Sequence, residues 1–152
     1  MTRLLLVEDY PPLATVVAIA LRRGTGHEVV RVGSVSRAEA ALAERGVFDV
    51  AVLDIDLPDG SGVDLARRLI ERGQVSACVF FTASRDEAER AAARQVGPVV
   101  DKLATMDELV QVVLTHLGAS AEHAPKLREA LRSAQGSDGD LTSGSGTRPR
   151  VR

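Results

Sequence analysis

The feature that most constrains the fold is an alternation of two kinds of segment along the chain. Short runs rich in β-branched and other apolar residues predict five strands, at residues 3–7, 28–32, 48–53, 77–81 and 98–100. Segments of helical period separate and follow them, at 12–23, 36–45, 62–73, 85–96 and 105–117. Because strands that alternate with helices favour a parallel sheet covered on both faces, we expect an α/β fold with a five-stranded, doubly wound (βα)5 sheet.

Composition and charge exclude several classes of protein. The chain has 152 residues, of which 45% are hydrophobic and 26% charged, as in a soluble domain with one core. The formal net charge of −2 provides no general attraction to nucleic acid or anionic lipid, so we expect neither direct DNA binding nor membrane binding. The apolar runs are too short to span a bilayer, and we expect a cytoplasmic protein. The single cysteine, Cys78, excludes an internal disulfide and a cysteine-based zinc site.

The chain divides into three regions by composition. Residues 1–118 contain all the predicted strands and form the expected domain. Residues 119–135 predict a short helical extension, with Leu127 and Leu131 spaced to share one helix face, which could dock on the domain. Residues 136–152 are rich in Gly and Ser and predict disorder. Because residues 119–152 are too few for a typical output domain, we expect a stand-alone domain.

Polar residues follow the predicted strands where each one ends. Glu8 and Asp9 follow the first strand, Asp54 the third, Thr82 the fourth and Lys102 the fifth. In an open parallel sheet, ligands bind beyond the carboxyl ends of the strands, near the point where the strand order reverses. These residues therefore predict a binding site at one edge of the sheet.

The types of residue at this edge indicate phosphoryl chemistry. Converging carboxylates raise one another's pKa unless a cation neutralises them, and oxygen ligands suit Mg²⁺, which binds few protein carboxylates and favours phosphate oxygens. Asp54 is the candidate nucleophile, with Lys102 and Thr82 placed to stabilise phosphoryl oxygens. Each residue alone is explained as well by a turn, a helix cap or a solvated surface position. The inference depends on their joint placement at successive strand ends.

These residues carry a resemblance to a known family. The chain resembles the receiver domain of bacterial two-component response regulators from residue 2 to about 118. LLLVED is similar to the family's first strand with its acidic pair, and VAVLDIDLPDGSGVDL to its phosphoacceptor strand and following loop; FFTAS contains the family's threonine and VVDK its lysine. The resemblance implies a flavodoxin-like receiver fold of the stand-alone, single-domain type.

The resemblance also implies a phosphoacceptor and a metal site. Asp54 would accept a phosphoryl group from a phosphohistidine on a sensor histidine kinase or a histidine phosphotransfer protein. Asp9 and Asp54 would bind Mg²⁺ directly, Glu8 would help through water, and the backbone carbonyl of Asp56 would complete the protein ligands. The domain would promote only its own phosphoryl transfer and dephosphorylation, and would not be an enzyme acting on other substrates.

Other positions would control the response. Thr82 and Lys102 would contact the phosphoryl oxygens, and Asp56 and Ser84 would tune the lifetime of the acyl phosphate. The protein would then relay the phosphoryl group or act on an unidentified downstream protein.

Two positions depart from the family pattern. The family usually has an aromatic switch residue three positions before the lysine, where this chain has Val99, and a proline directly after the lysine, where it has Leu103. Val99 cannot swing like an aromatic ring when the threonine moves, so the usual output mechanism is not expected to apply unchanged. Without the proline, we expect a trans peptide bond after Lys102, because a non-proline cis bond costs about 2.5–4 kcal/mol.

Two other functions fit parts of the pattern. A pseudo-receiver would keep the fold and signal without phosphorylation, which Val99 favours. A phosphohydrolase of the haloacid dehalogenase type would use Asp54 as nucleophile and Asp56 as general acid, since DIDLPDG is similar to that family's DxD loop. In that family the DxD loop comes first, whereas here Glu8 and Asp9 precede it, and the chain order argues against this function.

The last predicted helix is apolar on more than one face. Val110 and Leu114 point away from the face that can pack on the sheet, which consists of Leu109, Val112, Val113 and Leu117. Our hypothesis from the sequence is that Val110 and Leu114 belong to a homodimer or partner surface, unless the following helical extension covers them.

Overall fold

The computed structural model describes the backbone of residues 2–147 and the side chains of residues 2–118 and 125–134. Strands and helices alternate as the sequence predicts. The elements are β1 (Arg3–Val7), α1 (Pro11–Thr25), β2 (Glu28–Val32), α2 (Val35–Arg45), β3 (Phe48–Leu53), β4 (Asp56–Leu57), β5 (Gly60–Ser61), α3 (Gly62–Glu71), β6 (Val75–Thr82), α4 (Glu87–Arg94), β7 (Val99–Asp101) and α5 (Met106–Thr147).

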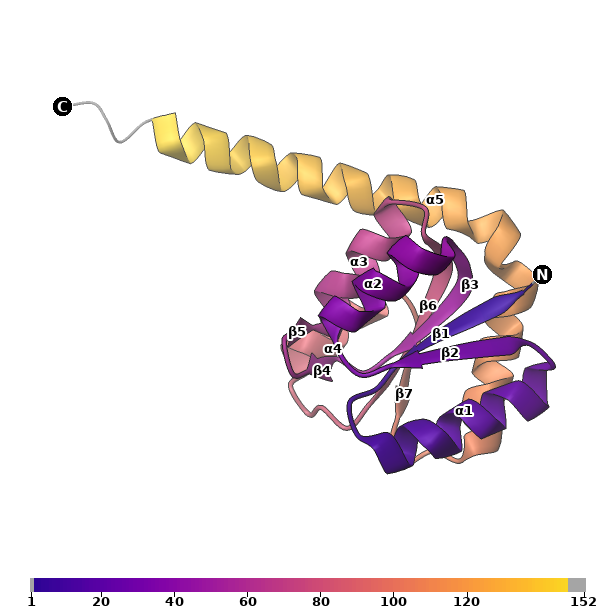
Figure 1. Ribbon diagram of the computed structural model, residues 1–152. Coiled ribbons are helices and arrows are strands. Elements are labelled where there is room, and N and C mark those ends of the chain that lie inside the picture. The colour runs from indigo at the N-terminus through magenta and orange to yellow at the C-terminus, as the bar shows by residue number, and fades with distance from the viewer. Residues whose placement is uncertain (1, 148–152) are drawn as a thin grey trace.

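The main sheet has five parallel strands in the order β2-β1-β3-β6-β7. Its central strands are buried on both faces, which explains their near-continuous apolar sequence. Helices α2, α3 and α4 cover one face, and α1 and the first part of α5 cover the other (Figure 1). The expected doubly wound sheet is therefore confirmed. Since β1 lies between β2 and β3, the strand order reverses at β1, which places the expected crevice at its carboxyl end.

The last helix differs from the sequence prediction. We expected the last helix to end at residue 117, before Gly118, with a separate helical extension over 119–135 and disorder from 136, but α5 runs from Met106 to Thr147 with Pro125 inside it. Gly118 is not among the glycines with positive φ, so it does not form a left-handed helix end. Residues 148–152, the end of the expected disordered tail, lie outside the described residues.

Tertiary contacts explain why the helix continues. After its first part against α1, α5 changes direction, passes the end of α3 and projects beyond the domain (Figure 1). Leu131 is only 4% exposed and joins the core cluster of α2, α3 and α4, with Leu127 packed against it. Arg128 Nε donates to the carbonyl of Ile70, at the end of α3, at 3.1 Å. Burial of Leu131 thus outweighs the helix-ending tendency of Gly118 and Pro125.

The hypothesis that Val110 forms part of an exposed partner surface is wrong. Val110 is buried, in the core cluster of α1 and α5. It packs on Gly24 of α1 so closely that a Cβ at Gly24 would collide with its side chain. The absent side chain of Gly24 therefore makes room for Val110, whereas Leu114 is 36% exposed.

Candidate functional site

The site begins where β1 and β3 end side by side. Val7 and Leu53 are opposite each other in the parallel register, so the residues that follow them meet at one edge. The backbone holds them there: the N–H of Asp54 donates to the carbonyl of Val7 at 3.1 Å, and the N–H of Glu8 donates to that of Val32 at 3.0 Å. The ladder thus continues one residue beyond the strands and fixes both acids.

Three carboxylates converge at this edge, as predicted. Oxygen atoms of Glu8, Asp9 and Asp54 all lie within 4.8 Å of one another. Glu8 and Asp54 are buried, with exposed fractions of 4% and 7%, while Asp9 is exposed. The group is thus open to solvent on the side of Asp9.

Lys102 extends from the turn after β7 into this acidic group. Its Nζ lies 2.7 Å from Asp54 Oδ2 and 2.9 Å from Glu8 Oε1. The N–H of Lys102 donates to the carbonyl of Thr82 at 3.0 Å, which anchors the turn to the end of β6. The ammonium of Lys102, which follows the fifth predicted strand, therefore pairs with both Glu8 and Asp54, which follow the first and third.

Burial and charge change the pKa of two of these groups. Burial raises the pKa of Glu8 above its ordinary value, and the hydrogen bonds from Lys102 and Tyr10 only partly offset this effect. Burial alone would lower the pKa of Lys102, but its hydrogen bonds to Asp54 and Glu8 outweigh burial and raise it. Lys102 is thus a stable cation beside the carboxylate of Asp54.

The donor set fits a hard divalent cation. Three carboxylates meet at the site while one ammonium faces them, and among the described residues Asp9 forms no ion pair. A dication beside Asp9 and Asp54 would offset the remaining negative charge, and oxygen-only ligands are those that Mg²⁺ prefers. The residues are therefore suited to hold Mg²⁺.

Thr82 lies at the end of β6 and is completely buried. Its Oγ1 accepts a hydrogen bond from the N–H of Ser84 at 3.1 Å. The hydroxyl of Ser84 lies 3.2 Å from Glu89 Oε1 and accepts from the N–H of Asp86 at 3.3 Å, so Ser84 connects this loop to the start of α4. A change at Thr82 can therefore reach α4 through one intervening residue.

The loop after Asp54 contains a small hairpin that the sequence analysis missed. Strands β4 and β5 pair Asp56 with Ser61, and the N–H of Asp56 donates to Asp54 Oδ1 at 3.3 Å. Asp56 itself is exposed. Gly62, directly after the hairpin, passes so close to the backbone carbonyl of Asp54 that a Cβ would collide with it. The sequence LPDGSG, with its Asp-Gly pair, was the available signal for this turn.

Asp59, in the turn of the hairpin, has a role that was not predicted. Its carboxylate accepts from the N–H groups of Val35 at 2.8 Å and Ser36 at 3.0 Å, which are the first residues of α2. These backbone hydrogen bonds lower the pKa of Asp59. The loop after Asp54 is therefore attached to the N-terminus of α2.

The two positions that depart from the family pattern lie on either side of Lys102. Val99 is half-buried, opposite Phe80 in the sheet and packed against the core. Leu103 is 84% exposed, and its N–H donates to Asp101 Oδ1 at 2.8 Å. No cis peptide bond is found in the described part of the chain, so the expected trans bond after Lys102 is confirmed.

Comparison with known proteins identifies the family. The family model described as "Response regulator receiver domain" matches residues 4–113. The chain belongs to this family. Receiver domains are signalling domains of two-component systems rather than classical enzymes. Within residues 2–147, every helix is too short or too polar to cross a lipid bilayer.

Among curated relatives, the "Transcriptional regulatory protein CutR" of Streptomyces coelicolor is 40% identical over 97 residues, covering 62% of this chain and 43% of that protein. The "Transcriptional regulatory protein TrcR" of Mycobacterium tuberculosis is 33% identical, covering 99% of this chain and 56% of its own length. The chain thus spans about half the length of these relatives. A CheY-like receiver domain from Methanospirillum hungatei JF-1 has the same fold, with a TM-score of 0.71 at 20% identity over 81% of this chain and 98% of that one.

Proposed function

We propose that this receiver is phosphorylated on Asp54 in a Mg²⁺-dependent reaction and signals through protein–protein contacts. The observation that carries the proposal is the position of Asp54, a buried carboxylate that lies beside the two acids that follow β1 and pairs with the ammonium of Lys102. The donor would be a phosphohistidine of a sensor histidine kinase or a histidine phosphotransfer protein. One curated relative, the "Sensor protein TorS" of Escherichia coli, is 36% identical over 81 residues, which cover 53% of this chain and 9% of that protein.

The proposed reaction is a transfer between two side chains. A carboxylate oxygen of Asp54 forms a bond to phosphorus while the bond from phosphorus to the donor's imidazole nitrogen breaks, and the imidazole leaves with the electron pair. Glu8, Asp9 and Asp54, with the carbonyl of Asp56, would hold Mg²⁺. When bound, the ion supplies positive charge that offsets the repulsion between the phosphoryl oxygens and the carboxylate.

The other residues act on the transferred group. Lys102 leaves Asp54 Oδ2, 2.7 Å away, and pairs with a phosphoryl oxygen, since the carboxylate loses its charge when it becomes an acyl phosphate. The buried hydroxyl of Thr82 donates to another oxygen. Asp56 and Ser84 set how readily water reaches the acyl phosphate and therefore its lifetime. Because Val99 replaces an aromatic ring, we propose that output passes through Ser84 to α4 rather than through a swinging ring.

Intact-protein mass spectrometry after incubation with acetyl phosphate tests the proposal. We expect one added phosphoryl group that requires Mg²⁺, is lost in Asp54→Asn and is retained in Asp64→Asn, a matched control on the exposed face of α3. Absence of an adduct, without consumption of acetyl phosphate, would favour a pseudo-receiver. Rapid turnover without an adduct would favour a phosphohydrolase.

A further inference from the structure

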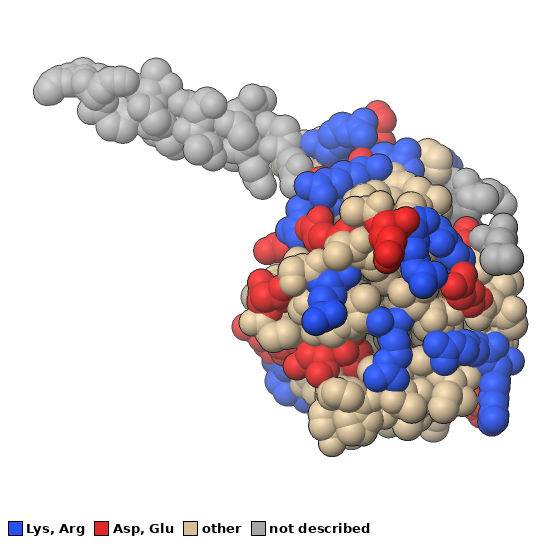
Figure 2. Space-filling view, viewed as in Figure 1, with Lys and Arg blue, Asp and Glu red and all other residues tan. Residues whose placement is uncertain are grey.

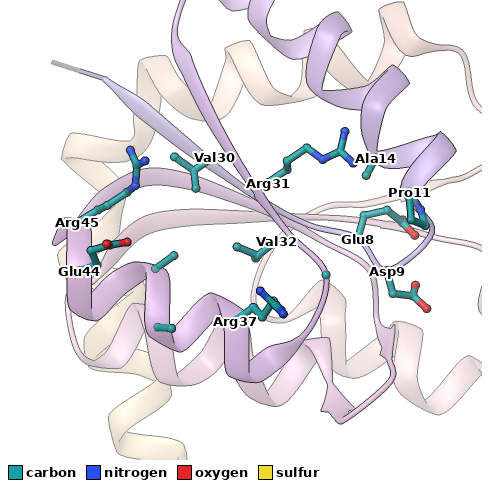
Figure 3. Close-up of a pocket in the computed structure, with 13 residues that line it drawn as sticks. Glu8, Asp9, Pro11, Ala14, Val30, Arg31, Val32, Arg37, Glu44 and Arg45 are labelled. Carbon is teal, nitrogen blue, oxygen red and sulfur yellow. The ribbon is translucent and has the colours of Figure 1, made fainter.

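A groove runs along the free edge of the sheet, between α1 and α2. It has a volume of about 520 Å³. Its floor is formed by Val30 and Val32 of β2, with Ala14 of α1 and Ala41 of α2 beside them (Figure 3). Among the strands of the described residues, β2 pairs only with β1, so its other side is an open strand edge. The groove therefore combines apolar side chains with main-chain groups that a further strand could bind.

The register shows which main-chain groups face the groove. The carbonyl of Val32 accepts from the N–H of Glu8, directly after β1, so the N–H and carbonyl groups of Val32 and of its alternate neighbour Val30 point toward β1. Val29 and Arg31 consequently point their N–H and carbonyl groups away from it. The outward carbonyl of Val29 accepts from Arg22 at 3.1 Å, but no such bond to Arg31 exists among the described residues. Arg31 offers one donor and one acceptor to an added strand.

Two guanidinium groups stand at the middle of this groove. Figure 2 shows several basic side chains across the face formed by α1, β2 and α2. Arg31 extends toward α1, where it donates to Thr15 Oγ1 at 2.6 Å, and Arg37 lies at the start of α2 (Figure 3). Within the described part of the chain, neither pairs with a carboxylate, in contrast to Arg45, which pairs with Glu28 at 3.1 Å. The middle of the groove thus has positive charge that no described carboxylate pairs with.

Acidic side chains occur at the two ends of the groove instead. Glu8 and Asp9 lie at one end and Glu44 at the other (Figure 3). A continuous phosphate backbone, as in single-stranded nucleic acid, would approach these acids at both ends. A second copy of β2 paired in antiparallel fashion would bring Arg31 and Arg37 against their own equivalents. Charge therefore disfavours both occupants.

We infer that the groove binds an extended segment of a partner protein, which adds a strand beside β2 and places an acidic side chain between Arg31 and Arg37. Main-chain hydrogen bonds to Arg31 give the segment its orientation, and Val30 and Val32 contact its alternate side chains. The charge-assisted hydrogen bonds from the two guanidinium groups select the acidic residue. This site is distinct from Asp54, although Glu8 and Asp9 border both.

Fluorescent peptides of about six residues, a common strand length, provide the test on the full chain. A set of alternating Val/Thr peptides contains one Glu at each position in turn, with matched peptides that have Lys in its place. We expect at least one Glu peptide to bind, its Lys counterpart to bind about tenfold more weakly, and Arg31→Gln or Arg37→Gln to weaken the Glu peptide about tenfold, which equals 1.4 kcal/mol. Arg23→Gln, an exposed position of α1 outside the groove, should change affinity less than about twofold.

Two further measurements separate strand addition from charge attraction alone. N-methylation of alternate nitrogens can be done in two ways, on the odd or on the even residues of the peptide. Only one of these two sets of N–H groups faces β2, and methylation of that set should abolish binding. In amide hydrogen exchange, bound peptide should protect the N–H of Arg31 by about tenfold or more. The inference is overturned if no Glu peptide binds at about 1 mM, if both N-methylated registers bind as well as the parent, or if an oligothymidine binds more tightly than every peptide.

Discussion

Leu131→Ala is expected to destabilise the domain although the residue lies well beyond the last strand. Leu131 is 4% exposed in the core cluster of α2, α3 and α4. The substitution removes three carbon groups, worth about 0.8 kcal/mol each in transfer free energy. A cavity term brings typical Leu→Ala losses to about 2.7–5 kcal/mol, and we expect about 3 kcal/mol because the site is near the edge of the core.

Urea denaturation followed by circular dichroism measures this loss. Leu114→Ala is the matched control on the same helix: Leu114 is 36% exposed, and the same transfer value scaled to its buried fraction gives an expected cost of about 1.5 kcal/mol. In thermal unfolding, a loss of 3 kcal/mol corresponds to about 10 °C for a domain of this size. Equal losses for the two variants, or a loss below about 1 kcal/mol for Leu131→Ala, would refute the packing of the later part of α5 on the domain.

Three other substitutions test separate features. Gly62→Ala should lower the free energy of unfolding, measured by urea denaturation, by more than about 2 kcal/mol because its Cβ collides with the Asp54 carbonyl. Gly118→Ala, with open space around it, should stabilise by up to about 1 kcal/mol. Similar changes in stability for the two variants would contradict this reasoning. Asp59→Asn should lower the urea denaturation midpoint at neutral pH. Because the pKa of Asp59 is lowered in the folded state, its carboxylate contributes stability above the unfolded value of 3.8, and this contribution is lost as pH falls through the folded value. A difference in midpoint between the native chain and the variant that persists at pH 2 would be inconsistent with this. Lys102→Met should slow phosphorylation by acetyl phosphate about a hundredfold or more, as loss of one preorganised charge does elsewhere, while Lys126→Met, exposed on α5, should leave the rate unchanged.

The sequence predicted the strands and the edge of the sheet that holds the candidate site. Strands buried on both faces have unambiguous apolar runs, and parallel strands bring their carboxyl ends together, so Glu8, Asp54 and Lys102 could be placed from chain order alone. The pairing of one ammonium with two of the acids depends on the path of the turn after β7, which no local pattern specifies.

The hairpin of β4 and β5 was missed although its turn signal is local, but the other errors concern contacts between distant segments. Gly118 and Pro125 have the composition of a helix end, but the distant surface of α3 supplies burial for Leu131. Val110 has a partner only because residue 24 of another helix has no side chain. Asp59 accepts hydrogen bonds from the first two residues of α2, which lie more than twenty residues earlier in the chain. Propensity and periodicity describe single segments, and such contacts are outside their reach.

The path of α5 has a consequence for how the molecule opens. In most doubly wound domains, each helix packs on one face of the sheet, so the helical layers on the two faces can fluctuate separately. Here one helix contributes Leu109 and Val113 to one layer and Leu131 to the other. Fraying of the C-terminal part of α5 would therefore weaken both layers, and slowly exchanging amides on opposite faces of the sheet should become exposed together, as one cooperative unit.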